Sequence, residues 1–164
     1  MKRLRAYMDT SVFGGYFDEE FETGSRSLFD AIWRGKITPL VSETVARELA
    51  DAPEQVRELF QRTLAGDCER LEVSPESIGL AGAYVQAGVV TQKYADDALH
   101  VASATLARAD VIVSWNFRHL VNPARIRAFN GVNVAQGQSQ VIILTPEDVA
   151  NSLEEGHEDQ GQDL

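Results

Sequence analysis

Hydrophobic positions along the chain fall into short apolar runs and into stripes at helical spacing. The runs predict strands at residues 4–8, 37–41, 71–73, 111–113 and 141–144. Stripes that recur every three or four positions predict helices at 25–33, 42–50, 53–64, 75–85 and 95–106, with a short one from 146. Strands that alternate with helices indicate an α/β domain with a mainly parallel central sheet flanked by helices.

Local signals refine these elements. Ser25 and Ser42 are expected N-caps, and the prolines at 53 and 75 are expected at helix starts. In the helix expected at 75–85, the buried stripe should be Ile78, Ala81 and Val85. In the helix expected at 95–106, it should be Leu99, Ala102, Ser103 and Leu106. Proline and glycine punctuation predicts a loop-rich region at 118–140.

Composition points to one globular domain. Of the 164 residues, 44% are hydrophobic, which is enough to form a core, and neither repeats nor a linker divide the chain. We expect the domain to span 1–152 and the acidic segment 153–164 to be a disordered tail. The single cysteine, Cys68, excludes an intrachain disulfide framework and fits a reducing cytoplasm. No run resembles a signal peptide or is long enough to cross a bilayer, so no membrane partner is expected.

Charge is unevenly distributed along the chain. The net charge of −10, taken alone, argues against a nucleic-acid partner. Segment 154–164 contributes five acids and no lysine or arginine, whereas 111–146 has no acid and contains Arg118, Arg125 and Arg127. Such a basic segment could hold a phosphate backbone, although chance clustering in a polar loop would explain it equally well.

Carboxylates occur where parallel sheets place their ligands. Asp9 follows the first strand, at the carboxyl edge of the expected sheet. Asp96 and Asp97 occupy the first turn of the central helix, where the helix dipole favours negative charge. Glu48 borders the apolar face of its helix. The simpler alternatives are that Asp9 caps the next turn and that Glu48 is a solvated helix residue.

Other chemistries lack their signatures. The chain has no glycine-rich phosphate loop, no zinc-like spacing among its histidines and no serine in a nucleophile elbow. His100 is expected to pack within its helix. A phosphoryl-accepting Asp9 would want a second acid two residues on, where the chain has Ser11. Carboxylates without cysteine or histidine ligands suit Mg²⁺ or Mn²⁺, ions that activate water in nucleases.

Four segments in order, MDTSVF, SETVAREL, DDALHVASA and VSWNF, resemble the PIN domain, the nuclease fold of the VapC-like toxins. The resemblance covers about residues 4–149. It implies a parallel sheet wrapped by helices and metal-dependent cleavage of RNA phosphodiester bonds. It also implies Asp9, Glu48 and Asp97 as metal ligands, whereas helical geometry alone leaves the choice between Asp96 and Asp97 open.

The chain departs from the family at a fourth position, where many members carry an acid and this chain has Asn116. The asparagine carbonyl can bind a cation or its water but adds no charge, which weakens the case for a second ion. Ser114 would orient a ligand or phosphate, or merely cap the strand end. Thr10 would help to hold phosphate or metal-bound water, or serve as a turn hydroxyl. The three arginines would hold the RNA backbone.

The sequence thus predicts a cytoplasmic, Mg²⁺- or Mn²⁺-dependent endoribonuclease. The resemblance further implies a homodimer and a small antitoxin protein that holds the enzyme inactive. The main alternative is a non-catalytic or weakly catalytic PIN scaffold that binds RNA or protein. Asn116 and the net charge of −10 favour the scaffold. The presence of all three expected ligands, Asp9, Glu48 and Asp97, opposes it. A fainter alternative is a phosphoesterase that acts on DNA.

Overall fold

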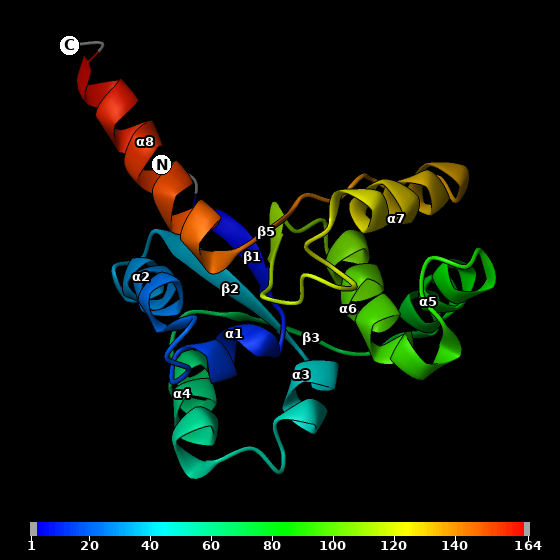
Figure 1. Cartoon of the computed structure of the whole chain (residues 1–164), viewed down its shortest axis with the longest axis horizontal. Coiled ribbons are helices and arrows are strands. Elements are labelled where there is room, and N and C mark those ends of the chain that lie inside the picture. The colour runs from blue at the N-terminus through cyan, green and yellow to red at the C-terminus, as the bar shows by residue number, and fades with distance from the viewer. Residues whose placement is uncertain (1–2, 163–164) are drawn as a thin grey trace.

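Five parallel strands form the centre of the protein (Figure 1). The computed structural model describes the backbone of residues 3–162 and the side chains of residues 3–155. The strands are β1 (Leu4–Met8), β2 (Ile37–Ser42), β3 (Glu69–Leu71), β4 (Val111–Val113) and β5 (Ile143–Leu144). They lie in the order β3-β2-β1-β4-β5, and every neighbouring pair is parallel. The predicted α/β class is confirmed.

Helices cover both faces of the sheet (Figure 1). On one side lie α1 (Ser11–Gly15), α2 (Glu22–Trp33), α4 (Glu54–Ala65) and α8 (Pro146–Gln162). On the other lie α5 (Pro75–Gln86), α6 (Ala95–Leu106) and α7 (Pro123–Ala135). The short helix α3 (Glu43–Glu48) follows β2, and a 3₁₀ turn (Gln92–Tyr94) precedes α6. Within the described part of the chain, every helix is too short or too polar to span a membrane.

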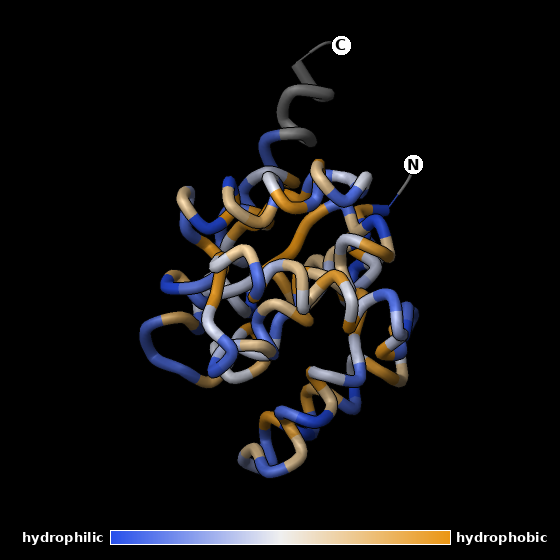
Figure 2. Tube along the Cα trace, turned by 90° about the vertical axis from the view of Figure 1, so that its right-hand side faces the viewer, coloured by the Kyte–Doolittle hydropathy of each residue, from blue (hydrophilic) through white to orange (hydrophobic). Residues whose placement is uncertain are grey.

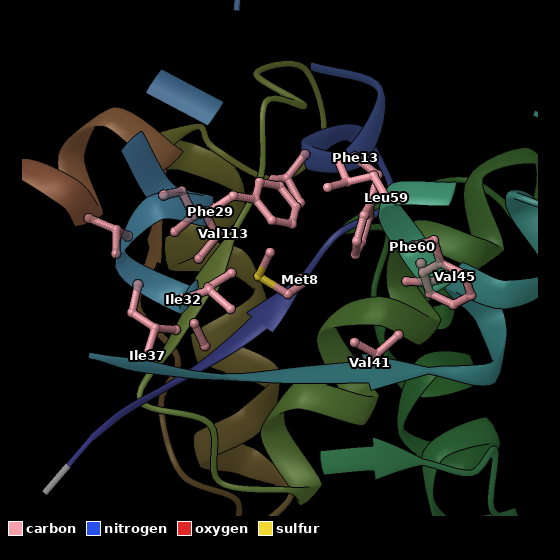
Figure 3. Packing of buried hydrophobic residues seen from close by; sticks show 14 of the residues in the cluster. Met8, Phe13, Phe29, Ile32, Ile37, Val41, Val45, Leu59, Phe60 and Val113 are labelled. Atoms are coloured by element: carbon pink, nitrogen blue, oxygen red, sulfur yellow. The ribbon is translucent and has the colours of Figure 1, made fainter. Parts of the chain in front are cut away.

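Side chains of strand β1 contribute to two separate hydrophobic cores, because successive side chains on a strand point to opposite faces of the sheet. Met8 packs into the cluster that contains Phe13 of α1 and Phe29 of α2, as Figure 3 shows. Tyr7 faces the other cluster, which includes Val101 of α6 and Phe129 of α7. Hydrophobic segments accordingly run through the interior of the molecule, with hydrophilic segments on many of the outer loops and helical turns (Figure 2).

Of the four predicted helix signals, Ser42 and Pro75 hold, Pro53 lies one residue before its helix as the N-cap of α4, and Ser25 fails. The Ser42 hydroxyl accepts a hydrogen bond from the Val45 N–H at 3.3 Å and caps α3, as expected. Pro75 is the first residue of α5. The Ser25 prediction is wrong, because α2 already begins at Glu22 and Ser25 is buried inside it.

The predicted stripes of α5 and α6 are partly wrong. Ile78 is 58% exposed, and α5 instead buries Ser77, Leu80, Ala81 and Tyr84. Helix α6 buries residues around most of its circumference, because α5 packs along it as well as the sheet. Leu99 and Leu106, expected at the centre of its stripe, are only half-buried.

The prediction of a loop-rich region at 118–140 is wrong, because helix α7 occupies much of it. Asn122 caps this helix by accepting from the Ala124 and Arg125 N–H groups, and Pro123 takes the first position. These start signals were present in the sequence. The helix lacks a wide apolar stripe, since only Phe129 and Asn133 are buried in it.

Smaller differences concern the edges of the domain. Strand β3 lies two residues earlier than predicted, and β5 is shorter. Helix α8 begins at Pro146 as expected but continues to Gln162, so its backbone is helical through most of 153–164. Leu153 packs against the core, and acids in the first turn favour the helix start. Residues 163–164 lie outside the described part of the chain, and the boundary at 152 and the disorder of the tail stay predictions.

Candidate functional site

The carboxyl ends of β1 and β4 bring polar residues together. Asp9 follows β1 and Ser114 follows β4, and the two strands are neighbours. The Ser114 and Ser11 hydroxyls each donate to Asp9 Oδ2 at 2.7 Å. Asp9 is buried, and its other oxygen lies 3.6 Å from His100 Nε2. The carboxylate is therefore held in one orientation, with Oδ1 free of the two serines.

An open pocket at this sheet edge collects most of the predicted site residues. Its lining residues are Asp9, Thr10, Ser11, Gly14, Gly15, Asp18, Phe21, Glu48, Asp97, Trp115 and Asn116. The three predicted metal ligands thus share one pocket with Asn116 and Thr10. Ser114 is fully buried and reaches the pocket through its bond to Asp9.

Glu48 is held by two donors. Its Oε1 lies 2.5 Å from His100 Nε2 and accepts from the Thr10 hydroxyl at 2.9 Å. Burial alone would raise the pKa of this carboxyl, but the hydrogen bonds from His100 and Thr10 and the charge of His100 outweigh burial and lower it. Glu48 is therefore ionised at neutral pH.

Behind Glu48 stands a buried pair of rings that the sequence did not reveal. Tyr7 and His100 are both fully buried, and the Tyr7 hydroxyl lies 2.6 Å from His100 Nδ1 and 2.7 Å from Ser42 Oγ. Burial raises the pKa of Tyr7, so the phenol stays protonated. Because the ionised Glu48 carboxylate can only accept, His100 Nε2 must be the donor in this pair.

The expectation that His100 only packs within its helix is therefore incomplete, because its ring also bonds to Tyr7 and Glu48. It lies one turn after Asp97, and residues three apart share a helix face. That spacing was the available signal. It places His100 on the same helix face as Asp97, but it does not indicate the bond to Tyr7.

Asp97 lines the pocket, and its neighbour Asp96 does not. Burial, and next the negative charge of Asp9, raise the pKa of Asp97 from 3.8 to about 6. Asp96 instead forms an exposed ion pair with Arg47 at 2.8 Å. The structure thus separates the two acids that helical geometry could not.

Asn116 presents its amide nitrogen to the acids. Nδ2 lies 3.4 Å from Asp97 Oδ1, a long contact, whereas Oδ1 accepts from the His119 N–H at 3.0 Å. The carbonyl oxygen that we expected to face a cation is therefore engaged by the backbone. In this arrangement Asn116 is a donor at the rim of the pocket.

The predicted RNA-binding arginines lie outside the lining of the acidic pocket. Arg118 lies over the ring of Tyr94 at 5.7 Å, and Arg125 donates to the Val89 carbonyl. Arg127 lines a separate pocket on α7. None of the three is among the residues that line the acidic pocket, and their role in binding substrate stays a prediction.

The donor set suits a hard divalent cation. Four acidic residues line the pocket without a thiolate: Asp9, Glu48, Asp97 and Asp18, which the sequence analysis did not single out. Burial, and next the negative charge of Asp9, raise the pKa of Asp97, and a bound cation would offset both effects. Within the described residues, however, no three acidic, histidine or cysteine side chains already enclose an ion. Glu48 is turned toward His100 and Thr10, so the carboxylates would have to draw together around the ion.

The sheet and the pocket define a class: an α/β protein with a parallel sheet and an acidic pocket at its carboxyl edge. The PIN domain model matches residues 5–118, and the chain belongs to this family. A comparison with proteins of curated function gives no match.

A solved structure shares the fold. It is the crystal structure of VapBC2 from Rickettsia felis bound to a DNA fragment from their promoter. The TM-score is 0.52 at 14% sequence identity, and the alignment covers 87% of this chain and 98% of that chain. At this identity the likeness concerns the fold alone.

Proposed function

We propose that this protein is a Mg²⁺- or Mn²⁺-dependent endoribonuclease and the toxin of a toxin–antitoxin pair. The observation that carries the proposal is the meeting of Asp9, Glu48 and Asp97 in one pocket of a PIN domain. They come from the end of β1, from α3 and from α6, three places far apart in the sequence. Core packing alone would favour apolar side chains there, because grouped carboxylates repel one another.

In this proposal Asp9, Glu48 and Asp97 hold the ion. A bound divalent ion lowers the pKa of a water and stabilises phosphate oxygens. The surrounding side chains orient the ligands: Ser11 and Ser114 fix Asp9, while Thr10 and His100 fix Glu48. The Asn116 amide is placed to donate to a phosphate oxygen at the rim.

We infer RNA as the substrate and a small antitoxin protein as a partner. The sequence resemblance to VapC-like toxins supports both, and the fold shared with a chain of a VapBC2 complex supports the second. We also propose a homodimer and a cytoplasmic location, which rest on the same resemblance. Co-purification with the product of a short neighbouring gene would test the antitoxin.

A second candidate is a PIN scaffold that binds RNA or protein with little catalysis. Asn116 favours it, because the family position for a fourth acid is neutral here and its carbonyl is occupied. A scaffold would bind RNA equally well with and without a divalent ion, whereas a nuclease would cleave only with one.

The deciding experiment is single-turnover cleavage of a panel of RNAs in Mg²⁺, in Mn²⁺ and in EDTA. We expect cleavage with either ion, none in EDTA, and at least a hundredfold slower cleavage for Asp9→Asn. Asp96→Asn is the matched control, because Asp96 lies outside the pocket, and it should cleave normally. Metal-independent cleavage, or full activity of Asp9→Asn, would contradict the proposal.

A further inference from the structure

Three aromatic side chains lie together beside the acidic pocket, and we call Phe21, Trp115 and Phe117 the aromatic platform. Phe21 stacks on Trp115 with ring centroids 4.6 Å apart and planes inclined by 26°. Phe117 lies 6.3–6.4 Å from both rings. Phe117 is 50% exposed, so part of its ring is open to solvent.

The centre of the platform is held rigidly. The Trp115 indole N–H donates to the Ser25 hydroxyl at 2.8 Å. A Cβ at Gly15 would lie 2.7 Å from the indole nitrogen, and one at Gly24 would lie 3.0 Å from the far edge of the ring. Two glycines and a buried serine thus form a slot for one tryptophan, and Phe21 stacks on the ring held in that slot.

Two of the three platform rings line the acidic pocket, and Phe117 lies outside its lining. Phe21 and Trp115 line it together with Asp9 and Asp97, and the donor Asn116 lies between Trp115 and Phe117 in the chain. A strand whose phosphate lay at the carboxylates would therefore have a flanking base within reach of the platform.

Two cationic side chains, Arg118 and Lys93, lie next to the ring of Tyr94. Arg118 follows Phe117, and its guanidinium lies 5.7 Å from the Tyr94 ring centroid. The ammonium group of Lys93 lies 5.6 Å from the same centroid. Aromatic rings interleaved with cations are the usual surface for a nucleic-acid strand with exposed bases, and they suit a phosphate-bearing ligand better than an apolar peptide.

We propose that the aromatic platform stacks an unpaired base next to the phosphate held at the acidic pocket, with Phe117 as the exposed ring that receives this base. This inference rests on the proposed function, since it takes the strand to be the substrate. Bases inside a duplex are already stacked on their neighbours and cannot lie flat on a protein ring. Phe117 supplies the open surface, and Phe21 and Trp115 support it.

The test compares Phe117→Ala, Phe117→Tyr and the control Ile78→Ala, which truncates a side chain of similar exposure on α5, outside the acidic pocket. The probe is an RNA oligonucleotide with one 2-aminopurine, whose fluorescence is quenched by stacking, used single-stranded and annealed to its complement. Stopped-flow mixing in Mg²⁺ records binding before cleavage, and cleavage is then followed in the same sample.

We expect Phe117→Ala to bind the single strand about 5- to 150-fold more weakly and to lose the quench. Phe117→Tyr should retain both, because it keeps a stacking ring, and Ile78→Ala should match the unmodified protein. Duplex affinity should be the same in all four proteins.

Each failure has its own signature. Unchanged single-strand affinity in Phe117→Ala, with cleavage intact, overturns the platform but not the nuclease, and leaves the rings to a protein partner. Equal losses for single strand and duplex also overturn it. Selective loss of stacking without any Mg²⁺-dependent cleavage supports the platform and refutes the nuclease. If the unmodified protein binds no single strand, both proposals fail.

Discussion

Replacing Asp97 by asparagine should stabilise the metal-free protein and remove its response to metal. The structure raises the pKa of this carboxyl from 3.8 to about 6, first through burial and then through the charge of Asp9. Two pKa units correspond to about 3 kcal/mol. Because Asp97 is only half-buried, solvent screening reduces this to on the order of 1 kcal/mol. Asn keeps the shape and removes the charge.

The sign of the pH dependence follows from the raised pKa. The folded protein holds the Asp97 proton more tightly than the unfolded chain, so the ionised form destabilises the fold. That penalty is absent below about pH 4, grows as the pH rises to about 6, and is constant above. The advantage of Asp97→Asn in free energy of unfolding should therefore appear over the same interval.

Metal should reverse the order of stability. An ion that binds only the folded state, present at a concentration of a hundred times its Kd, raises the free energy of unfolding by about 2.7 kcal/mol. Asp97→Asn should gain much less, because it lacks one ligand. The assay is urea unfolding followed by circular dichroism, in EDTA and in Mn²⁺, from pH 4 to pH 8. Asp96→Asn is the control and should respond to Mn²⁺ like the unmodified protein.

Two results would refute this reasoning. A less stable Asp97→Asn protein in EDTA would show that the cost of burying an ionised carboxylate next to Asp9 is not the dominant effect at this position. Equal stabilisation of the variant and the unmodified protein by Mn²⁺ would remove Asp97 from the set of ligands.

Three further changes test separate parts of the structure. Tyr7→Phe leaves a buried histidine nitrogen without its partner and should lower the free energy of unfolding by about 1–3 kcal/mol, measured by urea unfolding; an unchanged value would show that the bond is dispensable. Gly15→Ala places a methyl group 2.7 Å from the Trp115 indole, so it should lower the free energy of unfolding by about 1–3 kcal/mol and shift the tryptophan emission. Gly14→Ala is the control and should not shift the emission, because its added methyl group would have nothing within 4 Å; equal emission shifts in the two variants would argue against the slot. Arg118→Ala should reduce the slope of the salt dependence of single-stranded RNA binding by about 0.7, and Arg127→Ala should leave it unchanged, since Arg127 lines a separate pocket. A reduced slope for Arg127→Ala with an unchanged slope for Arg118→Ala would instead place the RNA along α7.

The strands and the sheet edge could be predicted because their signals are local. Runs such as Val111–Val113 suit a strand buried on both faces, and parallel strands end at a common edge. The meeting of Asp9 with Ser114 follows from those two facts. The choice of Asp97 over Asp96 needed the family resemblance, and in the structure Asp97 lines the pocket while Asp96 pairs with Arg47.

What could not be predicted depends on contacts between distant segments. The bond from His100 to Tyr7 joins residues 93 positions apart, and nothing near either residue marks it. The slot for Trp115 requires Gly15 and Gly24, whose purpose shows only when the chain is folded. Helix α7 was missed for another reason: it is attached through few buried side chains, so its stripe is faint.

The most direct test of the central claim is a calorimetric titration with Mn²⁺ of the unmodified protein, Asp9→Asn and Asp96→Asn. Asp9 is buried and lines the acidic pocket, and Asp96 is an exposed acid outside it. We predict that the unmodified protein and Asp96→Asn bind one ion with equal affinity and that Asp9→Asn binds it at least tenfold more weakly. Equal affinity in all three proteins would contradict a metal site formed by Asp9, Glu48 and Asp97.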